Sequence, residues 1–163
     1  PNDRYINDAK IAEALAQMLN RVGIEASVET MPKAVYFKRA SRGGPNKSPE
    51  FSFMLLGWGA GSGEASSPLK ALLHTYDKSK GLGAANRGRH SDAEVDKLVK
   101  QALATVDADA RGALLAKATE KAVGENYGVI PMHYQVNTWA AKAGYKYLPR
   151  TDERTIVTGL SNN

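Results

Sequence analysis

The chain has 163 residues, 42% hydrophobic and 24% charged, which is the composition of an ordinary globular domain with a core of its own. It contains no cysteine, which excludes disulfides, thiolate metal sites and cysteine nucleophiles. The formal net charge is +5, but the basic residues are not interleaved with aromatic ones and no stretch reaches the roughly 18 to 20 apolar residues of a membrane span, so we expect neither a nucleic-acid partner nor a transmembrane segment.

The first fifty residues predict two helices, a strand and a loop. Asn7 is expected to cap a helix with an apolar stripe at helical spacing, and Gly23 to end it. Residues 24–28 alternate between apolar and polar, which predicts a strand with one covered face. A short amphipathic helix over 33–42 and a loop over 41–50 follow.

Residues 51–56 carry almost no polar atoms and lead into a glycine-rich segment, 57–64. Because a core helix usually needs ten or more residues, this short apolar run predicts a buried central strand. The loop after the carboxyl end of such a strand is the usual place for a ligand in an α/β sheet. The candidate ligand-binding residues are therefore Gly57, Trp58, Gly59, Ala60, Gly61 and Glu64.

Trp58 can act as a stacking wall for a ligand, and the glycines allow close approach to the main chain. Two plainer interpretations stay open, in which Trp58 fills the core and the glycines only form a turn. A phosphate-binding loop is not indicated, because the Gly-Lys-Ser/Thr sequence is missing. The spacing of Gly59, Gly61 and Gly63 also differs from the dinucleotide pattern G-x-G-x-x-G.

Three helices are predicted next. The first starts with Ser67 as cap and Pro68 in the first turn. The second starts with the capping box at 91–94, in which Ser91 is the expected cap, and the third is capped by Asp107. The last two helices are expected to pack as a hairpin. The residues expected to face inward are Leu69, Leu72, Leu73 and Tyr76, then Val95, Leu98, Val99, Ala102, Leu103 and Val106, then Leu114, Leu115, Ala118 and Val123.

Residues 128–134 predict a further strand, in which Pro131 favours an edge position or a bulge. The tail, 145–158, has no clear period. This order of elements predicts one α/β domain over 1–163, a mixed sheet flanked by helices with part of the sheet parallel.

No catalytic constellation stands out. His74, His90 and His133 are far apart and lack metal-ligand spacing, so neither a metal nor a cofactor is expected. Ser62 is flanked by glycines but lacks the G-x-S-x-G elbow of a serine nucleophile. We therefore expect a protein that is not an enzyme. Two alternatives stay open: a small α/β hydrolase or transferase using Ser62 or Glu64, and a basic nucleic-acid-binding module.

Several segments also match one known pattern in the right order: Asn2-Asp3-Arg4-Tyr5-Ile6-Asn7-Asp8, Val22-Gly23-Ile24, residues 53–59 with Gly57-Trp58-Gly59, residues 90–96 (HSDAEVD), residues 129–134 (VIPMHY) and Asp152-Glu153-Arg154-Thr155. Together they resemble the carboxyl-terminal half of the family 5 extracellular solute-binding proteins. These are the peptide-, oligopeptide- and nickel-binding components of bacterial ABC importers.

The resemblance implies a two-lobed clamp with the type II periplasmic-binding-protein fold, of which this chain is similar to much of the second lobe. A peptide or related small solute would be held between the lobes and delivered to ABC permease subunits. The implied location is periplasmic or extracellular, peripheral to the membrane and in some members anchored to it.

In that family the glycine-tryptophan segment faces the cleft, and an aspartate shortly after the tryptophan holds the amino group of a peptide. The matching position here is Gly61, with Glu64 as the nearest carboxylate. Part of a lobe would also lack a neighbouring strand. We therefore expect an unpaired sheet edge and self-association of the chain.

Overall fold

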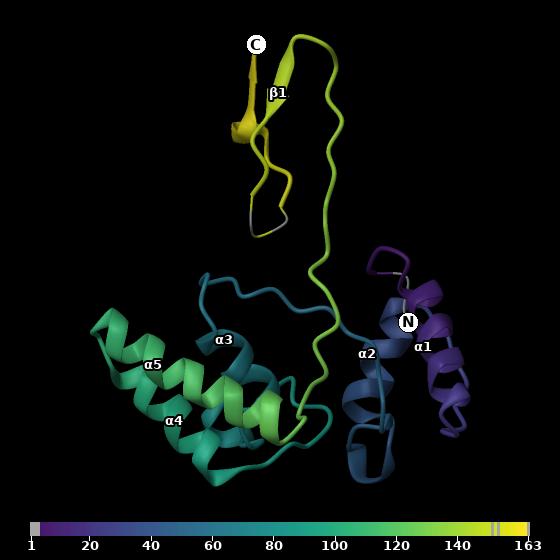
Figure 1. The fold of residues 1–163 in the computed structure, drawn as a ribbon, viewed down its shortest axis with the longest axis vertical. Coiled ribbons are helices and arrows are strands. Elements are labelled where there is room, and N and C mark those ends of the chain that lie inside the picture. The colour runs from purple at the N-terminus through teal and green to yellow at the C-terminus, as the bar shows by residue number, and fades with distance from the viewer. Residues whose placement is uncertain (1–3, 151, 153, 163) are drawn as a thin grey trace.

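A computed structural model of the chain describes residues 4–150, 152 and 154–162. The helices are α1 (Asp8–Arg21), α2 (Lys33–Arg42), α3 (Ser66–Pro68), α4 (Ala93–Ala104) and α5 (Ala108–Thr119), and the strands are β1 (Tyr145–Tyr147) and β2 (Leu160–Asn162). Figure 1 shows α1 and α2 together on one side, α3, α4 and α5 together on the other, and β1 at the end of a long connection. Asn2, Asp3 and Glu153, from the segments that resemble the solute-binding family, lie outside the described residues.

The largest core belongs to α3, α4 and α5. It consists of Leu69, Leu73, Val95, Val99, Ala102, Leu115, Ala118 and Ala122, with Leu98, Leu114 and Val123 packed against it. The predicted helical hairpin is confirmed, and the predicted cap at Asp107 accepts a hydrogen bond from the Ala110 amide at 2.8 Å. The cap of α4 is Asp92 and not Ser91: its carboxylate accepts from the amides of Glu94 and Val95 at 2.8 and 2.9 Å. Either residue type can cap, and the carboxylate is the one that reaches the free amides.

Three of the inward assignments in this cluster are wrong. Tyr76, Leu103 and Val106 are exposed. Tyr76 lies beyond the end of its helix, because the wide helical turn over Leu69–Leu73 stops at His74, whose backbone is extended. Val106 likewise follows the end of α4. The helix after Pro68 is also shorter than expected, and it begins at Ser66 and not after Ser67.

The pair of α1 and α2 has a smaller core of Tyr36 and Ala40. The Tyr36 ring contacts the rings of Phe37 and Phe51, with centroids 5.1 and 5.6 Å apart. Asn7 precedes α1, but its φ of 56° leaves its side chain without a capping hydrogen bond. The bounds of α2 are those predicted.

The sheet differs most from the prediction. It has two short antiparallel strands, with Tyr145 opposite Asn162 and Tyr147 opposite Leu160. In the part of the chain that the structure describes, residues 24–28, 51–56 and 128–134 are not strands. A strand requires a neighbouring strand to which its backbone is hydrogen-bonded, and these segments have no such neighbour among the described residues. The chain therefore combines a helix-rich fold with a small sheet, which is compatible with the expected α/β class, but the sheet of the described residues is antiparallel and not the expected mixed one.

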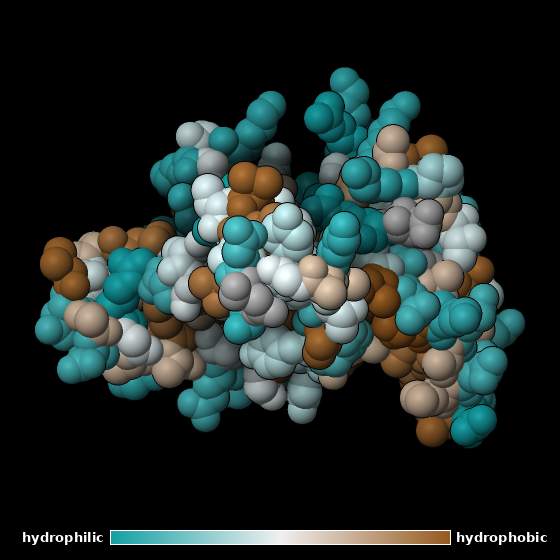
Figure 2. All heavy atoms as spheres, turned by 90° about the horizontal axis from the view of Figure 1, so that it is seen from above, coloured by the Kyte–Doolittle hydropathy of each residue, from teal (hydrophilic) through white to brown (hydrophobic). Residues whose placement is uncertain are grey.

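Large hydrophobic side chains are exposed along the whole described chain, among them Met18, Phe53, Val106, Tyr134 and Val157. Figure 2 shows brown hydrophobic residues at several places among teal hydrophilic ones on the face seen from above. Among the described helices, none is both long and apolar enough to cross a membrane.

Candidate functional site

The segment around Trp58 is held at its start by two tyrosines. The Tyr36 hydroxyl donates to the Leu55 carbonyl at 2.7 Å, and the Tyr5 hydroxyl donates to the Gly57 carbonyl at 3.0 Å. Burial raises the pKa of Tyr36 to about 12, so its hydroxyl keeps the donated proton across the physiological range. The backbone leading to Trp58 is therefore fixed to the α1 and α2 part of the molecule.

Gly57 also needs to be glycine for a packing reason. A Cβ at this position would lie 2.5 Å from Cε1 of Tyr5, so a side chain would displace the ring that holds the segment. At Gly59 and Gly61 a Cβ would meet nothing within 4 Å. These two glycines leave the main chain open to solvent on either side of Ala60.

Trp58 itself is 46% exposed, and Gly59, Ala60 and Gly61 beside it are exposed too. The interpretation of Trp58 as core filling is therefore wrong. Five of the six predicted site residues, 57–61, form one continuous stretch with the indole at its centre. Their role in ligand binding stays a prediction.

Glu64 is engaged elsewhere. Its carboxylate accepts from Nε and Nη2 of Arg111 at 2.9 and 2.7 Å, and the Ser66 hydroxyl donates to the same carboxylate. The Arg111 guanidinium also donates to the Ala102 carbonyl at 3.0 Å. Hydrogen bonds from Arg111 and Ser66 lower the pKa of Glu64 to about 2, so it is ionised and already paired. A ligand amine would have to compete with this bidentate pair.

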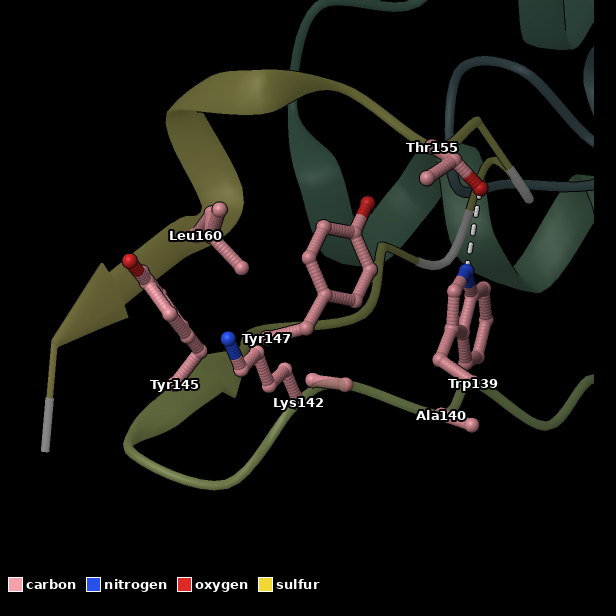
Figure 3. A pocket seen from close by; sticks show the side chains of 8 residues that line it. Trp139, Ala140, Lys142, Tyr145, Tyr147, Thr155 and Leu160 are labelled. Atoms are coloured by element: carbon pink, nitrogen blue, oxygen red, sulfur yellow. Dashed lines mark hydrogen bonds between the residues drawn. The ribbon is translucent and has the colours of Figure 1, made fainter.

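The structure shows a second candidate site on the carboxyl-terminal hairpin. A cavity of about 310 Å³ is lined by Trp139, Ala140, Ala141, Lys142, Tyr145, Tyr147, Thr155 and Leu160. Figure 3 shows these side chains along the connection into β1 and along the chain segment that returns beside it, with the Trp139 ring beside Tyr147. The two ring centroids are 5.6 Å apart.

The polar ends of both rings are occupied. The Trp139 indole donates to the Thr155 hydroxyl at 3.0 Å, and the Tyr147 hydroxyl accepts from the Ile156 amide at 3.1 Å. The rings therefore present mainly apolar surface to the cavity, and among the described residues Lys142 is its only charged lining residue. Sequence reasoning missed this site. Its signal was the aromatic residues Trp139, Tyr145 and Tyr147 within nine positions around a lysine.

The histidines have separate environments. His74 is buried, with Nδ1 at 2.8 Å from the Thr75 carbonyl and 3.2 Å from a carboxylate oxygen of Asp96. Its buried position and these two contacts indicate a structural role. His90 Nδ1 lies 2.7 Å from the Leu73 carbonyl, and His133 is exposed. Over the described residues, no group of three or more metal-ligating side chains comes together.

Comparison of the chain with protein-family models, with curated proteins and with solved structures gives no match.

Proposed function

We propose that this chain supplies one wall of a solute-binding site, in which Trp58 and the backbone of residues 57–61 contact a peptide or related small solute. The observation that carries the proposal is an exposed indole on a backbone segment that is held in place. Two tyrosine hydroxyls hold the carbonyls of Leu55 and Gly57, while the glycines beyond Trp58 leave its backbone open. Aromatic walls and open backbone donors are typical of small-molecule sites.

The proposal includes the larger setting that the resemblance implies. The chain would form part of the second lobe of a solute-binding component of a bacterial ABC importer, in the periplasm or outside the cell. A first lobe would close over Trp58, add the remaining contacts and exclude water, and permease subunits would receive the solute. Binding by this chain alone would therefore be weak.

The pairing of Glu64 with Arg111 and Ser66 restricts the kinds of solute that this wall could bind. Because Arg111 and Ser66 already satisfy its carboxylate, the chain offers no unpaired carboxylate at this position for the amino terminus of a peptide. The proposed contacts of this wall are stacking on Trp58 and hydrogen bonds to the main chain of 57–61. They suit solutes with a planar or apolar group and peptide-like polar atoms.

The test uses a Trp139→Phe variant, in which Trp58 is the only tryptophan. The probes are tri-alanine and Ala-Phe, titrated at up to tens of millimolar while Trp58 fluorescence is followed, with calorimetry in parallel. We expect a spectral shift with either peptide and a loss of about three- to tenfold in affinity for Trp58→Ala. Glu13→Gln, which removes an exposed carboxylate on α1, is the control and should leave affinity unchanged. Equal affinity in Trp58→Ala would remove this residue from the site.

A further inference from the structure

Residues 130–137 follow a bend at Gly128 and Val129 and form a long connection without a strand partner among the described residues. In the described chain, none of the amides or carbonyls of 129–141 makes a backbone hydrogen bond. The nearest such bonds join Gly128 to Ala122 and Tyr145 to Lys142. Positive φ angles occur at Tyr127 and Gly144 and at no residue between them. Figure 1 shows this stretch as a single line of ribbon leading from the helical cluster toward β1.

The side chains of this segment divide into two kinds. Ile130, Met132, Tyr134 and Val136 alternate with Pro131, His133 and Gln135, so an extended backbone places the four apolar side chains on one face. These four are 67%, 43%, 98% and 77% exposed. Alternation and exposure together are typical of a strand edge, and the described residues supply no partner for it.

We propose that residues 130–136 pair with the same residues of a second copy of this chain, as an antiparallel strand pair with its two-fold axis at His133. In this register Ile130 lies opposite Val136 of the second copy, and Met132 lies opposite Tyr134. All four apolar side chains therefore meet apolar neighbours across the pair. A shift by one residue would place each of them opposite a residue of the other face.

Pro131 agrees with this register. Directly opposite residues in an antiparallel pair alternate between hydrogen-bonded and non-hydrogen-bonded positions. If Ile130, Met132, Tyr134 and Val136 take the hydrogen-bonded positions, then Pro131 and His133 take the others. Proline has no amide hydrogen, so it is tolerated where the amide points away from the partner. The one residue that could break the ladder thus falls where no bond is needed.

Charge also favours a second copy at this place. The molecule carries a net charge of +5, so two copies repel each other in general, but residues 126–141 contain no lysine, arginine, aspartate or glutamate.

A strand pair alone is small beside the roughly 1,000 Å² that marks a specific interface, so we expect a dissociation constant in the micromolar range and not the nanomolar range. The proposal does not depend on solute binding at Trp58.

Disulfide trapping tests the register, because the natural chain has no cysteine. Residues opposite each other in a non-hydrogen-bonded pair have Cα atoms about 4.5 Å apart, within the range a disulfide spans. Mild oxidation of His133→Cys should therefore give a covalent dimer. Asn137→Cys alone should not, because the two copies of residue 137 would lie at opposite ends of the pair. A mixture of Pro131→Cys and Gln135→Cys proteins should form the mixed disulfide.

Sedimentation velocity gives the second measurement. The natural chain should show a reversible monomer–dimer equilibrium between about 1 and 300 μM. His133→Lys, which places two like charges on the axis, should raise the dissociation constant at least tenfold, whereas His133→Thr should leave it within about twofold. A monomer at 300 μM would overturn the proposal and leave this edge to a different partner. Association without preferential trapping at 133, or unaffected by His133→Lys, would overturn it too.

Discussion

Glu64 joins two parts of the sequence that are 47 residues apart. Its carboxylate binds Arg111 of α5 through two hydrogen bonds, and Arg111 also binds the Ala102 carbonyl near the end of α4. Bidentate arginine–carboxylate pairs fix geometry more strongly than single contacts do. Glu64 therefore sets where the glycine-rich segment ends and where α3 begins, with Ser66 buried beside it.

This pair predicts a dependence of stability on pH. The pKa of Glu64 falls from 4.5 to about 2 in the folded chain, mainly through Arg111 and then through Ser66. A lowered folded-state pKa contributes stability that is present above pH 4.5 and is lost as the pH falls toward 2. Glu64→Gln cannot titrate, so its free energy of unfolding should fall less steeply over this interval than that of the natural chain. Urea denaturation at a series of pH values measures both slopes.

The control for this experiment is Glu13→Gln, which removes an exposed carboxylate on α1. Its slope between pH 4.5 and 2 should match that of the natural chain. If Glu64→Gln also kept the natural slope, the bond to Arg111 would not be made in solution.

The α4 and α5 hairpin is the most cohesive element of the fold. Val95, Val99, Ala102 and Ala118 are fully buried between its helices and the turn over Leu69–Leu73. Small alanine side chains at the contact let the helix axes approach closely, and the two aspartate caps satisfy free amides at both helix starts. Each local signal agrees with the packing.

Leu115 tests this packing. It is 5% exposed in the core cluster, so Leu115→Ala should lower the free energy of unfolding by about 2–5 kcal/mol through lost burial and the cavity left behind. Leu103, which is 41% exposed on α4, provides a matched leucine. Leu103→Ala should change the free energy by no more than about 0.5 kcal/mol. Equal losses in the two variants, by urea denaturation, would contradict the arrangement of the hairpin.

Helices and strands differ in how far the sequence determines them. The stripe and caps of α4 and α5 are local, so their positions could be predicted to within a few residues. The apolar run before Trp58 and the alternation over 129–136 are local too, and they indicate an extended backbone. Whether an extended segment becomes a strand depends on a neighbour elsewhere, which the pattern does not contain.

In the candidate site too, some features follow from the local sequence and others require the tertiary structure. The exposure of Trp58 among glycines follows from its own surroundings in the sequence. The pairing of Glu64 with Arg111, 47 positions later, and the meeting of Trp139 with Thr155 require the tertiary arrangement. Local patterns therefore singled out Trp58, whose role as a ligand-binding wall stays a prediction, but not the partner of the carboxylate.

At the scale of the molecule, the buried hydrophobic residues are unevenly distributed. The cluster of α3, α4 and α5 contains most of the buried hydrophobic residues, and α1 and α2 contribute Tyr36 and Ala40. Of the hairpin residues that the structure describes, none is buried. The segment that begins at Trp58 and the connection over 129–141 join these parts with few contacts of their own, so they should open with little cost, whereas 51–57 is held to α1 and α2 by Tyr5 and Tyr36.

Chymotrypsin can measure this difference, because its preferred aromatic residues occur in both kinds of region. Tyr134, Phe53 and Trp58 are exposed on the connections, whereas Tyr36 is 2% exposed in the core of α1 and α2. At low micromolar protein concentration we expect the first cuts after Tyr134, Phe53 and Trp58, and a resistant fragment that contains α4 and α5, identified by mass spectrometry. Cleavage after Tyr36 should follow only when that core unfolds.

At high concentration the proposed strand pair should slow the cut after Tyr134 and leave those after Phe53 and Trp58 unchanged. Simultaneous cleavage at Tyr36 and Tyr134 would instead mean that the three parts unfold as one unit.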